Sequence, residues 1–208
     1  YKEQNSAMRK AKKIIKDFNG DTHKTVLFLS YKAENWNTMD NIYKKYCQEK
    51  DIKVIVQCVP YYYKNIDGTF EKYIDGGMYP EYVTITPIED YNYVNENPDV
   101  IVFQYPYDNY NSAGTTDPVF YSYNLASHTQ KLIYIPYFRT DEIDENDMRA
   151  YTNMDAYVTM PGVVYADKVI VQSEEIRKLY IKKLTDFFGE ESEDEWEDKI
   201  EAEDIGGI

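Results

Sequence analysis

Short apolar runs separated by amphipathic stretches form the main pattern along this chain of 208 residues. The runs, bounded by polar or turn-forming residues, lie at 25–30, 52–59, 82–86 (a weaker one), 100–104, 132–135 and 166–173. Runs of this length are typical of strands buried on both faces of a sheet. Between them, apolar residues recur at helical spacing, as in 36–47 and 176–187. The alternation predicts an α/β fold with a doubly wound, mostly parallel, Rossmann-like sheet.

Local signals add two details to this pattern. Asp67-Gly68 lies between aromatic stretches and predicts the turn of a hairpin-like excursion after the second strand. Ser173 follows the last strand and precedes two glutamates, which predicts that it caps the helix that begins there.

Two of the apolar runs end in a proline followed by a tyrosine, at Pro106-Tyr107 and Pro136-Tyr137. Proline cannot donate to a sheet ladder, so these prolines should mark where the strands stop. The residues beyond them then lie outside the carboxyl ends of the strands, where open α/β sheets bind ligands. With the turn after the first strand, this edge yields eight candidate substrate-binding residues: Tyr31, Lys32, Tyr105, Tyr107, Asp108, Tyr110, Tyr137 and Arg139.

The chemistry of these candidates leaves alternatives open. Tyrosines offer flat, hydrogen-bonding surfaces suited to a sugar, polyol or nucleotide, but 23 of them in one chain equally fit a compositional bias. Arg139 is the best candidate for a phosphate contact because its planar fork matches phosphate oxygens. Lys32, near a helix start, could meet a phosphate or be a plain surface lysine. Asp108 could accept hydrogen bonds from hydroxyl groups of a ligand or act as a base. It could equally cap its loop or pair with Arg139.

The sequence lacks the motifs of several enzyme classes. It contains no nucleophile elbow, P-loop or paired-cysteine motif, and no glycine-rich turn follows the first strand. Its two histidines, His23 and His128, precede predicted strands and therefore belong to the opposite edge of the sheet. We expect no metal, no cofactor and no catalytic residue.

The two ends of the chain differ in charge. Residues 5–18 predict an amphipathic helix within an amino-terminal segment 1–22, and its basic face suits either solvent or an anionic lipid surface. Residues 190–208 predict a disordered or fraying acidic tail, since ten carboxylates there oppose one lysine. This leaves a net charge of −5 on residues 1–189, which include the α/β domain at 23–189, and argues against nucleic-acid binding. No apolar run approaches the roughly 20 residues of a membrane span, so we expect a cytoplasmic protein with peripheral membrane association at most.

Several segments together resemble a known family. They are residues 26–33 with Trp36, Pro60-Tyr61-Tyr62, the stretch 99–110, the stretch 132–138, and Pro161-Gly162 followed by 166–174. Over residues 24–188 the chain resembles the amino-terminal half of bacterial CDP-glycerol glycerophosphotransferase-like proteins, which are related to teichoic-acid polymerases.

The resemblance implies a GT-B arrangement, in which two Rossmann-like domains face each other across a cleft. This chain would supply the acceptor side, and a carboxyl-terminal domain or subunit would hold the CDP donor. The implied reaction transfers glycerol phosphate from CDP-glycerol to a hydroxyl of a glycan or polyol-phosphate acceptor, in teichoic-acid or cell-wall synthesis at the inner face of the membrane.

The chain departs from the family pattern in two places. Pro136-Tyr137-Phe138 stands where better-known members carry a Trp-His-Gly segment with the proposed base, and a tyrosine, with an ordinary pKa of about 10, is a poor substitute. The second departure lies after the acidic tail, where the family pattern continues into a donor domain and where we expect none in this chain. We therefore expect a domain that is inactive alone. The alternative is a non-catalytic binding or scaffold domain that retains the fold without the chemistry.

Overall fold

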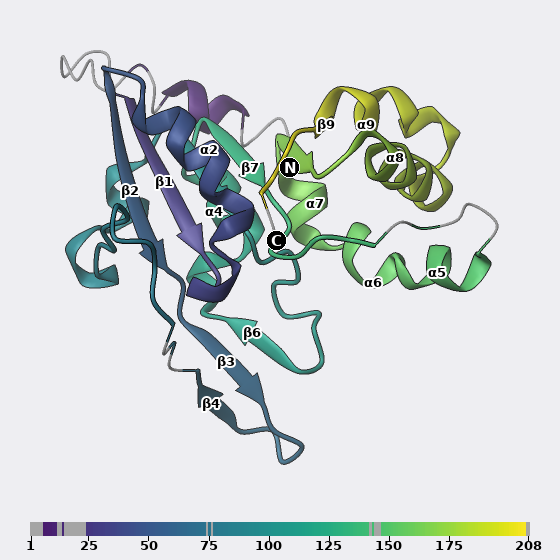
Figure 1. Cartoon of the computed structure of the whole chain (residues 1–208), viewed down its shortest axis with the longest axis horizontal. Helices are drawn as coiled ribbons and strands as arrows, with labels where there is room; N and C mark the ends of the chain where they lie inside the picture. The colour runs from purple at the N-terminus through teal and green to yellow at the C-terminus, as the bar shows by residue number, and fades with distance from the viewer. Residues whose placement is uncertain are drawn as a thin grey trace.

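The computed structural model describes residues 6–11, 14, 24–73, 75, 77–141, 143 and 147–206. Its main sheet has six strands, all paired in parallel, in the order β2-β1-β5-β7-β8-β9. The strands are β1 (Lys24–Ser30), β2 (Ile52–Cys58), β5 (Val100–Phe103), β7 (Lys131–Tyr134), β8 (Lys168–Val171) and β9 (Ile200–Ala202). The predicted α/β fold with a parallel sheet is confirmed (Figure 1).

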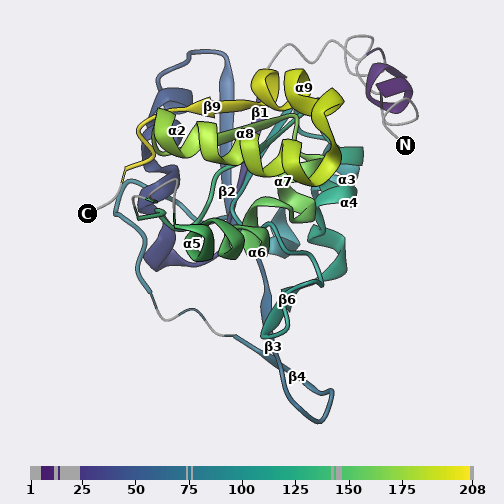
Figure 2. The same ribbon diagram turned by 90° about the vertical axis from the view of Figure 1, so that its right-hand side faces the viewer.

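Helices cover both faces of this sheet. On one face, α2 (Asn37–Cys47) packs its buried Met39 and Ile42 against Val26 and Phe28 of β1. The other face carries the helices α3 (Tyr93–Glu96), α4 (Ser122–Ser127), α5 (Met148–Asn153), α6 (Asp155–Val158), α7 (Pro161–Tyr165), α8 (Glu174–Phe188) and α9 (Glu193–Lys199). Figure 2 looks onto this face, where α8 and α9 lie side by side. Successive strand residues point to opposite faces of a sheet. In β1, Val26 and Phe28 pack on one face and Leu27 and Leu29 on the other, so both faces are apolar.

The strand order reverses next to β1. From β1 the chain turns one way to β2, and β5, β7, β8 and β9 then follow one another on the other side. The neighbours β1 and β5 therefore flank a topological switch point, the place where doubly wound sheets bind ligands outside the carboxyl ends of their strands.

A small antiparallel sheet extends from the main one. It consists of β3 (Tyr61–Lys64), β4 (Phe70–Lys72) and β6 (Gly114–Thr116) in the order β4-β3-β6. The β3–β4 hairpin projects away from the main sheet in both views (Figures 1 and 2). Its turn uses Gly68 at φ 83°, a conformation that glycine adopts without strain. The predicted hairpin is confirmed.

The weak strand predicted at 82–86 is wrong. Only an isolated bridge joins Ile85 to Val56. Pro80 and Pro87 bracket this segment and remove two backbone donors, which limits its pairing. The short 3-10 helix η2 (Ile88–Asp90) follows it, and others are η1 (Ala33–Asn35), η3 (Pro118–Phe120) and η4 (Glu190–Ser192).

The start of α8 follows its sequence signal. The Ser173 hydroxyl accepts a hydrogen bond from the Ile176 amide at 3.3 Å, and Glu174 and Glu175 occupy the first turn. This confirms the predicted cap.

The acidic end of the chain differs from the expected disordered or fraying tail. Residues 190–202 form η4, α9 and β9, and β9 pairs in parallel with β8 at the edge of the main sheet. The physical reason is that apolar residues are spaced among the carboxylates: Trp196, Ile200 and Ile205 are each at most 3% exposed. Arg177 of α8 also donates to the carbonyl oxygen of Ile200 at 2.7 Å. Burial of these side chains outweighs the charge of the segment.

The amino-terminal segment is described only in part. Residues 6–11 and 14 are helical, and the rest of the helix expected at 5–18 lies outside the described residues, as does His23. Across the part of the chain that is described, no helix combines the length and the apolar character needed to cross a membrane.

Candidate functional site

Six tyrosines gather at the carboxyl edge of the main sheet, and we call them the tyrosine rim: Tyr31, Tyr61, Tyr73, Tyr105, Tyr107 and Tyr137. Tyr31 follows β1, Tyr105 and Tyr107 follow β5, and Tyr137 follows β7. Because parallel strands end at the same edge, the fold itself brings these four together. The rim lies at the switch point between β1 and β5.

The rim is packed ring against ring. The Tyr31 ring centroid lies 4.8 Å from that of Tyr137 and 5.3 Å from that of Tyr105, and Tyr105 lies 5.1 Å from Tyr107. The hydroxyl oxygens of Tyr107 and Tyr137 are 3.4 Å apart. Tilted and edge-on contacts at these distances are favourable for aromatic pairs. Tyr31, Tyr61 and Tyr105 are buried, whereas Tyr107 and Tyr137 remain partly exposed.

Gln104 links the carboxyl ends of the neighbouring strands β1 and β5. It follows β5 and is completely buried. Its side-chain oxygen accepts the Tyr31 amide at 3.0 Å, and its side-chain nitrogen donates to the Asn35 carbonyl oxygen and the Thr38 hydroxyl at 2.9 and 2.8 Å. Sequence reasoning missed this residue, although a glutamine that ends a buried apolar run is itself a signal, because a buried amide needs partners.

Lys32 is not a plain surface lysine. Its ammonium nitrogen lies 4.4 Å from the ring centroid of Tyr73, 5.0 Å from that of Tyr31 and 5.7 Å from that of Tyr61. Its side chain is only 14% exposed, and Glu34 lies 3.8 Å away. An ammonium within about 6 Å of aromatic faces is attracted by their electron density. Lys32 thus places one positive charge within the rim.

Burial keeps the phenols of Tyr31, Tyr105 and Tyr107 protonated. The pKa values of Tyr31, Tyr105 and Tyr107 are raised well above the ordinary value, first by burial and then by neighbouring tyrosines. Such groups donate and accept hydrogen bonds at neutral pH but do not act as bases. The described residues also include no group of three or more His, Cys, Asp and Glu side chains that could hold a metal ion.

Asp108 is buried and bonded to the start of α4, and its side chain does not belong to the rim. It is 4% exposed and has a positive φ of 49°. Its carboxylate accepts both the amide and the hydroxyl of Ser122 at 2.8 Å and so holds the start of α4. Burial raises the pKa of Asp108 to about 6, against the lowering effect of the bonds from Ser122. Of the roles weighed for Asp108, the structure supports capping.

Tyr110 and Arg139 are not among the packed side chains of the rim. Tyr110 is 73% exposed. The Arg139 guanidinium donates to the Gly206 carbonyl oxygen at 3.1 Å and lies 3.8 Å from the Asp204 carboxylate, so the end of the chain engages it. The structure therefore brings together five of the eight predicted residues: Tyr31, Lys32, Tyr105, Tyr107 and Tyr137. Tyr61 and Tyr73 join them from the hairpin region.

A separate cleft of about 770 Å³ lies at the opposite edge of the sheet. Gln130, Asp167 and Lys199 line it, and each immediately precedes or joins the amino end of β7, β8 or β9. Residues 6, 9 and 10 of the amino-terminal helix form another wall. The cleft shares no residue with the rim, and its size alone would suit a small molecule.

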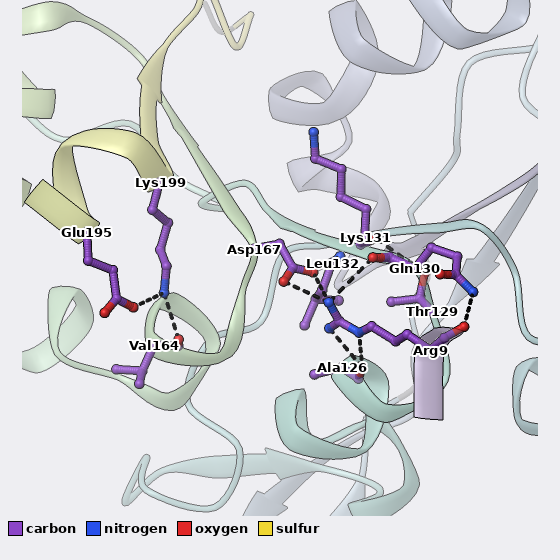
Figure 3. Close-up of polar contacts among 10 residues, drawn as sticks. All are labelled: Arg9, Ala126, Thr129, Gln130, Lys131, Leu132, Val164, Asp167, Glu195 and Lys199. Carbon is purple, nitrogen blue, oxygen red and sulfur yellow. Dashed lines mark hydrogen bonds and ion pairs between the residues drawn. The ribbon is translucent and has the colours of Figure 1, made fainter. Parts of the chain in front are cut away.

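Arg9 and Lys199, two charged residues that line this cleft, are paired with other groups of the chain (Figure 3). Arg9 forms an ion pair with Asp167 at 2.8 Å and donates to the carbonyl oxygens of Ala126 and Gln130. Lys199, which is 7% exposed, donates to the Val164 carbonyl oxygen at 2.9 Å. These contacts anchor the amino-terminal helix and α9, and we interpret the cleft as the seam between them and the sheet.

Comparison with known proteins yields no relative. No protein-family model, no curated protein and no solved structure matches the chain.

Proposed function

We propose that this chain is the acceptor-side domain of a CDP-glycerol glycerophosphotransferase-like protein in the GT-B arrangement, and that the tyrosine rim binds the acceptor. The single observation that carries the proposal is the convergence of Tyr31, Tyr105, Tyr107 and Tyr137, with Lys32, at the switch point of the sheet. Ligands of doubly wound domains bind at this edge.

The chemistry of the rim fits a polyol that carries a phosphate. Aromatic faces and phenol hydroxyls suit the carbon–hydrogen and hydroxyl groups of a polyol. The ammonium of Lys32 supplies the positive charge for a phosphate. The sequence resemblance points to the same ligand class, since the related enzymes extend glycerol-phosphate acceptors.

The rim offers no base for the transfer step. Its buried tyrosines keep their protons, and Asp108 is engaged by Ser122. The domain then binds an acceptor and depends on a second domain or subunit for the donor and for catalysis. The second candidate is a non-catalytic binding or scaffold domain, and the close packing of the rim tyrosines against one another favours it.

Calorimetric titration of the chain with sn-glycerol 3-phosphate, CDP-glycerol and CDP tests the proposal. We expect sn-glycerol 3-phosphate to bind, and Lys32→Ala to weaken it about tenfold or more, as the loss of one hydrogen bond to a charged group implies. Lys44→Ala is the matched control. Lys44 lies on α2, outside the rim, and its ammonium nitrogen is also close to a tyrosine ring, 4.9 Å from the ring centroid of Tyr82. Absence of heat with every ligand would favour the scaffold function.

A further inference from the structure

A surface groove lies where α7, α8, η4 and α9 meet, on the face seen in Figure 2. Its volume is about 360 Å³. The residues that line it are Val164, Phe188, Glu191, Ser192, Glu195 and Trp196. Three of these side chains are apolar and two are carboxylates, and none belongs to the tyrosine rim.

Two phenylalanines beside the groove remain exposed at the end of α8. Phe187 is 62% exposed and Phe188 is 41% exposed. Their ring centroids are 4.9 Å apart, and that of Phe188 is 5.3 Å from the ring centroid of Trp196. The three rings therefore form one apolar surface that runs from solvent to the buried Trp196. Contiguous exposed aromatic surface of this kind marks interaction sites, whereas single exposed apolar residues are ordinary.

The floor of the groove is held in place by its own contacts. The Trp196 indole nitrogen donates to the Ser192 hydroxyl at 2.9 Å, and this hydroxyl donates to the Gly189 carbonyl oxygen at 2.6 Å. The Lys199 ammonium nitrogen lies 4.6 Å from the Trp196 ring centroid. Since the groove is ordered in the free protein, a partner loses less affinity to the ordering of side chains.

The surroundings of the groove are strongly negative. Residues 186–198 contain eight carboxylates, all exposed, and no lysine or arginine. Lys182 pairs with Asp186 and Lys199 with Glu195, which leaves six carboxylates in excess of these two lysines. Such a surface attracts a cationic partner, and it repels anionic lipids, nucleic acids and a second copy of this chain, whose net charge is −14.

The adjoining cleft at the amino edge already holds a basic helix. Val164 and Glu195 line both the groove and this cleft. Arg9 and Lys10 of the amino-terminal helix line the cleft together with Glu195 and Asp198 of α9. The groove therefore continues a seam in which α9 lies beside a basic helix of the same chain.

We propose that the groove docks a basic amphipathic helix of a partner protein. The apolar stripe of this helix packs on Phe187 and Phe188, and its lysines or arginines face the surrounding carboxylates. Charge complementarity and the continuity with the seam carry this choice of partner. The inference does not depend on the acceptor-binding function.

The probe for this surface is a fluorescently labelled designed peptide of leucine and lysine, with the leucines on one face of the helix. Fluorescence anisotropy should show saturable binding to the wild type. Phe187→Ser and Glu191→Lys should each weaken it about fivefold or more. The matched controls are Phe70→Ser, since Phe70 in the hairpin is also 62% exposed, and Glu49→Lys, which makes the same charge change at an exposed position after α2. Neither control should alter the affinity.

A second peptide of the same composition, with the leucines distributed around the helix, should bind the wild type about fivefold more weakly. Equal effects of groove and control variants, or equal affinity for the two peptides, would reduce the binding to general charge attraction and overturn the proposal. Absence of peptide binding would overturn it as well. Self-association of the wild type that Phe187→Ser abolishes would assign the groove to a second copy and contradict the proposed partner.

Discussion

The amide of Gly162 donates to the carbonyl oxygen of Pro106 at 2.8 Å, and a Cβ at Gly162 would lie 2.4 Å from the Pro106 Cα. This contact joins the first turn of α7 to the chain just beyond β5. Pro106 stands between Tyr105 and Tyr107, so the contact fixes the backbone from which two rim tyrosines extend. Only glycine allows the two backbones to approach this closely.

Gly162→Ala should therefore destabilise the protein and disturb the rim. Overpacking of a close contact typically costs about 1–3 kcal/mol. We expect a loss of that size in the free energy of unfolding from urea titration, with a changed near-ultraviolet circular dichroism of the tyrosines. Gly68→Ala, in the hairpin turn where a Cβ meets no atom but φ is 83°, should lose stability through backbone strain alone and keep the spectrum. Equal stability of Gly162→Ala and the wild type would contradict this role.

Asp108 should make stability depend on pH in an unusual direction. Its folded-state pKa of about 6 exceeds the ordinary 3.8, so between these values the folded protein holds a proton that the unfolded chain has lost. Stability contributed by this group is therefore highest below pH 4 and falls as the pH rises to 6, by about 3 kcal/mol in all.

Asp108→Asn removes this titration and suits the positive φ of the position, which asparagine tolerates. The difference in unfolding free energy between variant and wild type should shift by about 3 kcal/mol in favour of the variant from pH 4 to pH 7. Denaturant titrations across this range measure it. A difference that stays constant with pH would show that Asp108 titrates normally.

Trp196 tests whether the acidic end of the chain is part of the fold. It packs against Phe188, with ring centroids 5.3 Å apart, and its indole nitrogen donates to the Ser192 hydroxyl at 2.9 Å. Trp196→Ala should lower the free energy of unfolding by about 3–5 kcal/mol. Asp194→Ala, at an exposed position of the same helix, should change it by less than about 0.5 kcal/mol. A fraying tail would give the same small effect for both variants.

Arg9 should anchor the amino-terminal helix to the sheet. Its guanidinium contacts Asp167 and two backbone carbonyl groups, and the Gln130 side chain donates back to the Arg9 carbonyl oxygen at 3.0 Å. Arg9→Ala should speed amide hydrogen exchange in residues 6–11 at least tenfold, because the contacts that hold them are lost. Lys10→Ala, the neighbour that lines the same cleft, should not. Equal exchange in both variants would remove Arg9 from this role.

The grouping at the carboxyl edge could be predicted because it follows from strand direction alone. Once Pro106 and Pro136 mark two strand ends, parallel pairing places Tyr107 and Tyr137 on one edge, and the turn after β1 brings Tyr31 to it. The pattern of apolar residues contains this information directly.

The remaining contacts depend on tertiary packing that no local pattern encodes. Tyr61 and Tyr73 reach the rim through the course of the hairpin, and Arg139 turns to the end of the chain. A positive φ turns Asp108 inward toward Ser122. For the acidic end, the carboxylates dominate the composition, but the spacing of Trp196 and Ile200 decides the structure.

Chemical-shift mapping of the chain during titration with sn-glycerol 3-phosphate shows directly whether the tyrosine rim binds the acceptor. We expect saturable amide shifts centred on Tyr31, Lys32, Tyr105, Tyr107 and Tyr137 at the carboxyl edge. Shifts confined to Arg9, Asp167 and Lys199 at the amino edge, or none at all, would contradict it.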